Sequence, residues 1–188
     1  LRLHSLLDPD AAAGLGFLDD DAIVDPGYEL NRPNPEWATW GRNVAGALAN
    51  SSRIPTTFAF AFYNGVKISD PGRGETVFVN YPTTPTNQLG NEVGNPTIVA
   101  GNVTWASNQT GLIGTGVLKG PAMGQPLMLL AEARFLESEA QLKGFIPGDF
   151  VATYYEGITG SFAYLYKNES ETIVQSVGTL VTSYIADN

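Results

Sequence analysis

The chain has 188 residues, of which 43% are apolar and only 15% are charged. This composition favours a folded domain over a disordered chain. The formal net charge of -9 argues against binding to nucleic acid or to an anionic membrane surface, because both attract basic faces. The sequence contains no cysteine, which excludes a disulfide framework, thiolate catalysis and a zinc site built on sulfur.

The first two thirds of the chain are rich in turn signals. Residues 1–7 (LRLHSLL) have the spacing of the last turns of an amphipathic helix, which Asp8 and Pro9 end. Residues 8–124 show no lasting helical period and carry many Pro and Gly turn signals, so we expect a loop-rich region there. A loop region of this length usually carries function or inserts into a scaffold.

Two runs within this region are typical of short strands. They are residues 56–63 (TTFAFAFY) and residues 76–81 (TVFVNY). In the first run Phe58, Phe60 and Phe62 alternate with alanines, so an extended chain would place the three rings on one face.

The last third of the chain is predicted to be helical. Apolar residues at helical spacing cover residues 127–142, and Gly144 ends this helix. Asp149 is a suitable N-cap for a second helix that runs through Lys167. A third helix is expected from about Glu171.

The two longer helices are joined by a short turn, which predicts an antiparallel helical hairpin of the repeat-protein type. Gly157 and Gly160 in the second helix leave room for another backbone to approach closely. We therefore expect a mainly α fold with long irregular loops and a few short strands. The predicted organisation is one partial domain, 1–188, with a helix end at 1–7, a loop-rich region at 8–124 and a hairpin plus third helix at 125–188.

The sequence offers no strong constellation for catalysis. His4 is the only histidine, so a catalytic triad or a histidine metal site would lack partners nearby. Glu132 and Glu139 share a helix face but lie about 10.5 Å apart along its axis, beyond the separation of about 5–9.5 Å between paired glycosidase carboxylates. We expect no enzymatic activity; the alternative is a secreted glycoside hydrolase that uses Asp70 and Glu75.

The densest acidic cluster is Asp19, Asp20 and Asp21. Carboxylate oxygens are ligands that calcium prefers, but the spacing is not that of an EF-hand loop. Calcium is thus the only cofactor candidate, and a solvated acidic loop is the alternative.

Aromatic residues among polar loop residues are the clearer functional signal. Tryptophan rings stack on the CH faces of sugars, while nearby Asn and Arg side chains bond the sugar hydroxyls. The alternative, that these rings anchor the long loops to the helices, stays open. The candidate glycan-binding residues are Trp37, Trp40, Trp105, Asn34, Arg42 and Asn102.

Residues 125–166 carry a more specific pattern. The stretch QPLMLLAEARFLESEAQLKGFIPGDFVATYYEGITGSFAYLY resembles the SusD/RagB family, in which a helix of the form ML-AEA-FL-AEA--RG is followed by GD----YY--GI-ASF. Upstream, NPEWATW is similar to the family's Asn-Pro-aromatic loop, and LRLHSLL to the end of its LRLRLL helix. The matching residues in the hairpin are Met128, Ala131, Glu132, Ala133, Phe135, Leu136, Glu139, Ala140, Gly144, Gly148, Asp149, Tyr154, Tyr155, Gly157, Ile158, Ser161 and Phe162.

The chain also departs from the family pattern. Gly72 separates Pro71 from Arg73 in what would be an Asp-Pro-Arg element, and Thr159-Gly160 stands where Arg-Ala is common. The signal peptide, the lipobox cysteine, the N-terminal repeat helices and the C-terminal helix of the family have no counterpart here. We therefore expect this sequence to be a fragment of a longer protein.

The resemblance implies a helical, TPR-containing scaffold with decorating loops. It implies an extracellular, lipid-anchored protein on the outer membrane of a Gram-negative bacterium. The protein would bind oligosaccharides without turnover and deliver them to a partner, a SusC-like TonB-dependent transporter. A peptide ligand is the first alternative within the same architecture, and a scaffold that binds only protein is another. Four Asn-x-Ser/Thr sequons leave a secreted eukaryotic glycoprotein as a further alternative.

Overall fold

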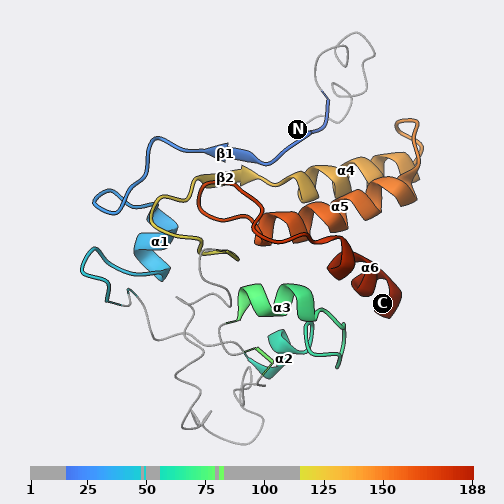
Figure 1. Ribbon diagram of the computed structural model, residues 1–188. Helices are drawn as coiled ribbons and strands as arrows, with labels where there is room; N and C mark the ends of the chain where they lie inside the picture. Colours follow the sequence, from blue (N-terminus) through green and yellow to red (C-terminus); the bar gives the residue numbers. More distant parts are fainter. Residues whose placement is uncertain (1–15, 48, 50–55, 79–80, 83–114) are drawn as a thin grey trace, which may run out of the picture. The chain divides into compact units, whose positions relative to one another are not determined.

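The computed structural model describes residues 16–47, 49, 56–78, 81–82 and 115–188 (Figure 1). In this part of the chain there are six helices and one two-stranded sheet, and 42% of the residues are helical. The expectation of a mainly helical chain is confirmed at this level. The predicted helix end at residues 1–7 lies outside the described residues, as do Asn102 and Trp105. No helix within the described ranges is both long and apolar enough to cross a membrane.

The chain forms two compact units. Unit 1 combines Leu1–Val24 with Pro126–Ser161, and unit 2 combines Asp25–Gln125 with Phe162–Asn188. The boundary falls inside helix α5 (Phe150–Leu165), so this helix contributes its first part to unit 1 and its end to unit 2.

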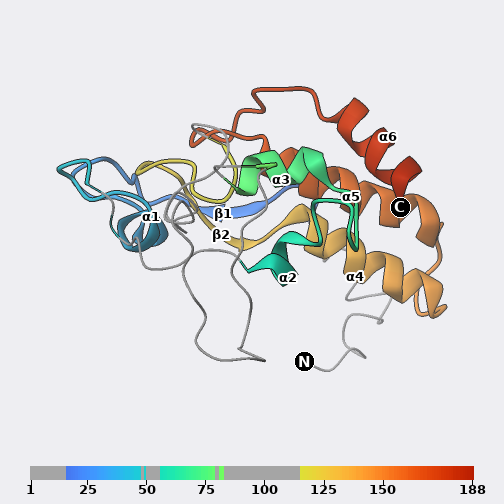
Figure 2. The same cartoon turned by 90° about the horizontal axis from the view of Figure 1, so that it is seen from below.

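Unit 1 is built around the predicted hairpin. Helix α4 (Leu130–Leu142) and helix α5 lie side by side in both views of the ribbon (Figures 1 and 2). A strand precedes them: β2 (Gln125–Met128) pairs with β1 (Ala22–Val24). The prediction that the first helix starts at residue 127 is therefore wrong: residues 125–128 form β2, and the helix starts at Leu130.

The start of α4 is fixed by two carboxylates. The Leu129 N–H donates to Glu132 Oε2 at 3.0 Å, and the Leu130 N–H donates to Asp21 Oδ1 at 2.8 Å. Because both carboxylates bond N–H groups that have no partner inside the helix, they end the strand and begin the helix at this point.

The turn of the hairpin follows the sequence prediction. Gly144 has a φ of 71°, a left-handed conformation that glycine adopts without strain and that ends α4. Asp149 Oδ1 accepts hydrogen bonds from the N–H groups of Val151 at 3.0 Å and Ala152 at 3.2 Å. Asp149 is thus confirmed as the N-cap of α5.

Small residues let the two helices approach. A Cβ added to Gly160 would lie 3.4 Å from the backbone nitrogen of Ala131, and one added to Gly157 would lie 2.6 Å from the ring of Phe135. The predicted close approach of another backbone is confirmed for Gly160, whereas Gly157 makes room for a ring. Arg134 adds ion pairs to Glu137 on α4, to Glu156 on α5 and to Asp19.

The helices of unit 2 are α1 (Pro35–Trp40), α2 (Thr57–Phe60), α3 (Pro71–Val77) and the longer α6 (Gly178–Asp187). Helix α2 and the end of α3 stand where strands were predicted. The strand prediction for residues 56–63 is wrong because Thr56 Oγ1 accepts the Ala59 N–H and nucleates a helical turn. The strand predicted at residues 76–81 is also wrong at its start, where α3 still continues.

The three phenylalanines of this segment do not share a face. Phe60 is completely buried, and its ring centroid lies 5.3 Å from that of Phe78 and 5.6 Å from that of Tyr81. Phe58 and Phe62 are exposed. Four residues apart, they pair with each other on the outside.

The end of α5 is held by a buried lysine that sequence reasoning did not single out. Lys119 Nζ donates to the carbonyl oxygens of Gly116 at 2.9 Å, Tyr164 at 2.6 Å and Lys167 at 2.9 Å. It also lies 4.3 Å from the centroid of the Tyr164 ring. A positive charge on the last carbonyls of a helix satisfies acceptors that the helix leaves open and complements its dipole.

The third helix starts later than predicted. Instead of beginning at about Glu171, α6 begins at Gly178. Glu171 has a φ of 57° and lies inside the turn that the isolated bridge between Lys167 and Ile173 closes. A left-handed residue interrupts any helix at this position.

Candidate functional site

The α1 tryptophans are positioned by an asparagine cap. Asn34 Oδ1 accepts the N–H groups of Glu36 at 2.8 Å and Trp37 at 3.3 Å, and Pro35 occupies the first turn, where it costs no hydrogen bond. Trp37 and Trp40 are three residues apart on this helix, a spacing that brings two side chains to the same side. Both rings are half-buried.

Asn34 itself has a structural role. It has no exposed surface, its Nδ2 donates to Gln125 Oε1 at 3.2 Å, and its backbone N–H donates to the Pro121 carbonyl at 2.8 Å. Since the amide is occupied on both sides, a ligand would have to break the cap to reach it. Asn34 therefore orients the tryptophans and does not itself face a ligand.

Arg42 lies just beyond α1 and is exposed. One guanidinium nitrogen, Nη1, donates to the Gly46 carbonyl at 2.9 Å. The guanidinium carries five N–H donors, so this single bond leaves donors for a ligand's hydroxyls. We call Trp37, Trp40 and Arg42 the α1 surface.

The Trp37 ring packs on the backbone at the end of α1. A Cβ on Gly41 would lie 2.6 Å from Cδ2 and from Cε3 of Trp37, so the ring covers the glycine that ends α1. Anchoring of the loop and exposure to a ligand are therefore compatible for Trp37: its ring packs on the backbone at Gly41, and the residue stays partly exposed.

The three acidic residues considered for calcium have separate partners. Asp19 pairs with Arg134, Asp20 Oδ1 accepts the Asp21 N–H, and Asp21 Oδ1 accepts the N–H at the start of α4. Across the described ranges, no group of three or more His, Cys, Asp or Glu side chains is arranged to hold a metal ion. This geometry gives the cluster a role at the start of the hairpin.

The two carboxylates considered for hydrolysis are engaged in a buried cluster. Asp70 caps α3 by accepting the Arg73 N–H, and its Oδ2 pairs with Arg73 Nε at 2.5 Å. Glu75 Oε1 accepts the Tyr166 hydroxyl at 2.5 Å. Burial raises the pKa of Asp70, and the guanidinium of Arg73 opposes this shift.

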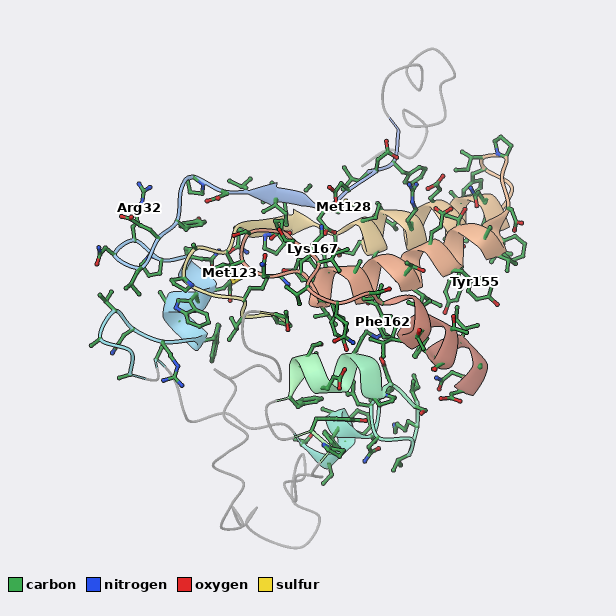
Figure 3. The ribbon with its side chains drawn as sticks, in the orientation of Figure 1. Arg32, Met123, Met128, Tyr155, Phe162 and Lys167 are labelled. Carbon is green, nitrogen blue, oxygen red and sulfur yellow. The ribbon has the colours of Figure 1, made fainter. Side chains whose placement is uncertain are left out.

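The same cluster joins distant parts of the sequence. The guanidinium carbon of Arg73 lies 4.7 Å from the ring centroid of Phe162 and 4.6 Å from that of Tyr184. The Tyr166 hydroxyl donates to the Gly72 carbonyl at 2.7 Å. Phe162, labelled in Figure 3, thereby links the end of α5 to α3 and α6. Arg73 and Tyr166 were not among the predicted site residues, because only the fold brings them together.

Comparisons of the chain with protein-family models, with curated proteins and with solved structures found no match.

Proposed function

We propose that this chain belongs to a non-catalytic glycan-binding protein of the SusD/RagB type, displayed on the outer membrane of a Gram-negative bacterium. The observation that supports it most is the contact between two elements on which the resemblance rests. Arg73 of the Asp-Pro-Gly-Arg element stacks on Phe162 of the second motif. A Cβ on Gly72 of the same element would lie 2.9 Å from that ring. Elements that pack on each other fit one shared scaffold.

The α4–α5 hairpin supports the scaffold part of this proposal. Antiparallel helices that cross at small residues are the unit that TPR-type scaffolds stack. Several large apolar residues of this hairpin are exposed, which suits a unit whose neighbours in a stack cover it. They are Phe135, Leu136, Leu142, Phe145, Phe150, Val151, Tyr154 and Tyr155.

Ligand capture is assigned to the α1 surface. The open parts of the Trp37 and Trp40 rings would stack on the CH faces of a sugar, and Arg42 would bond its hydroxyls. A few stacked rings and hydrogen bonds give moderate affinity, as a protein that hands its ligand to a transporter requires. The partner is a SusC-like TonB-dependent transporter, and a lipid anchor holds the protein at the membrane.

Affinity electrophoresis in gels that contain polysaccharide tests the site. We expect Trp37→Ala and Trp40→Ala each to weaken retardation by about tenfold, since loss of a binding tryptophan costs on the order of 1–2 kcal/mol. Phe145→Ala is the matched control, because Phe145 is also an exposed aromatic, at 48%, but lies in unit 1. Unchanged retardation of both tryptophan variants would remove the α1 surface from the proposal. Retention on peptides in place of glycans would favour the peptide-binding alternative.

A further inference from the structure

A second exposed aromatic surface lies at α2. Phe58 and Phe62 are 54% and 38% exposed, and their ring centroids are 5.6 Å apart at an interplanar angle of 73°. Lys67 Nζ lies 4.0 Å from the centroid of Phe58 and 4.8 Å from that of Phe62. We call these three residues the α2 surface.

The lysine is held in place by the backbone around it. The Lys67 N–H donates to the Ala61 carbonyl at 2.9 Å, and Gly65, with a φ of 86°, turns the chain just before it. This fold-back returns Lys67 to the end of α2. The ammonium group is therefore placed over the rings by the turn, and a ligand need not order the loop that carries it.

Lys67 differs from the other described cations in its partners. Within the described residues, its ammonium group lies over the two rings and pairs with no carboxylate or carbonyl oxygen. Aromatic rings attract an ammonium group but do not neutralise it. The other described Lys and Arg side chains all bond oxygen: Arg32, Arg42 and Lys119 bond backbone carbonyls, whereas Arg73, Arg134, Lys143 and Lys167 pair with carboxylates.

An un-neutralised cation beside two exposed rings matches one kind of sugar. The CH face of a pyranose packs on aromatic rings, and a carboxylate on the same sugar would pair with the ammonium group. In a chain of net charge -9, most of the surface repels such an anion, so a local positive charge selects where it binds. We infer that the α2 surface binds an acidic sugar unit, a hexuronate, within the captured glycan. This inference rests on the proposed function, because that function supplies the glycan.

The test compares oligogalacturonate with its methyl ester, which has the same rings without the charge. Calorimetric titration of the full chain should show tighter binding of the acid, by about fivefold for one partly exposed charge pair. The difference should shrink as salt is added, since exposed charges are screened. Lys67→Gln should abolish the difference, and Lys67→Arg should retain it. Oligomers of mannuronate and glucuronate are titrated in parallel.

Two controls separate this inference from its rivals. Lys143→Gln also removes one exposed positive charge, from an ion pair with Glu139 in unit 1, and should leave the preference for the acid intact. If both lysine variants lost the preference for the acid equally, the preference would be a general charge effect, and the inference would be overturned. Failure of all three acidic oligomers to bind, while neutral glycans still bind, would also overturn it and leave the proposed function standing. Binding of no glycan of either kind would overturn both.

Discussion

The guanidinium carbon of Arg73 lies 4.7 Å from the centroid of the Phe162 ring, so a residue at the start of α3 is fixed to the end of α5. The same guanidinium is also held by Asp70, whose carboxylate pairs with Arg73 Nε. A planar guanidinium can stack on rings and bond a carboxylate in its plane at the same time. Arg73 therefore organises unit 2 through both of its properties.

Replacing Arg73 by lysine should lower the free energy of unfolding by about 1–2 kcal/mol, because an ammonium group cannot stack on Phe162 and Tyr184 while it bonds Asp70. Urea unfolding of the full chain measures this change. Arg42→Lys is the control, since Arg42 is exposed and its side chain makes one hydrogen bond within the described residues, to the Gly46 carbonyl. This variant should stay within about 0.5 kcal/mol of the parent chain. Equal effects of the two substitutions would contradict the role given to Arg73.

Gly72→Ala should destabilise the chain by about 1–3 kcal/mol, as overpacking does in a filled core. The added methyl group would lie 2.9 Å from Cε1 of Phe162 and 3.3 Å from Cβ of Leu180. Gly178→Ala adds the same methyl group in open space at the start of α6 and should be neutral or slightly stabilising. Thermal unfolding measures the stability of both variants. A Gly72→Ala chain as stable as the Gly178→Ala chain would show that the packing around Phe162 is loose.

Lys119→Met should cost at least about 2 kcal/mol in unfolding free energy, because the carbonyl oxygens of Gly116, Tyr164 and Lys167 lose their donor while they stay largely buried. Lys143→Met is a suitable comparison, since Lys143 is exposed and forms only an i,i+4 pair with Glu139, a kind of pair that is worth about 0.3–0.5 kcal/mol. Chemical unfolding measures both. Similar losses would mean that Lys119 is not the cap described for α5.

Stability should fall in alkali. Burial and the hydrogen bond to Glu75 raise the pKa of Tyr166 above its usual value of 10.0, and burial also raises the pKa values of Tyr63 and Tyr81. Above pH 10.0 the unfolded chain has therefore released phenolic protons that the folded chain still binds. The unfolded state then holds fewer protons, so the free energy of unfolding decreases as pH rises.

Tyr166→Phe tests this linkage. It should cost about 1–3 kcal/mol at neutral pH, through the lost bonds to Gly72 and Glu75. Above pH 10.0 its stability should decline less steeply than that of the parent chain, because one of the three linked phenols is gone. An unchanged slope between the two chains would show that Tyr166 titrates alike in the folded and unfolded states.

Local signals were enough to predict the hairpin. Gly144 and Asp149 act within one turn of their own positions, so a helix end and a helix start could be read from neighbouring residues. The start of α4 could not, because Asp21 reaches it from a distant part of the sequence. The strand at 56–63 was predicted from alternating rings, yet a spacing of four residues also pairs Phe58 with Phe62 on a helical turn.

The candidate site was predicted only in part. Asn34 followed by Pro35 is a helix-start signature, and it would have indicated a capping role for Asn34 before any role in ligand binding. Lys119 gave no sequence signal, because its partners are backbone carbonyls from two separate segments. The position of Lys67 over two rings depends on a fold-back of the chain that residue spacing alone does not specify.

Glycan binding without turnover is measured most directly in a glycan-array screen of the full chain, with release of reducing sugar assayed in the same wells. We expect binding to at least one class of oligosaccharide with no release of reducing ends. Binding should fall in a chain that carries both Trp37→Ala and Trp40→Ala. Turnover of a bound glycan, or binding to none of the arrayed glycans, would contradict the proposed capture of glycans without catalysis.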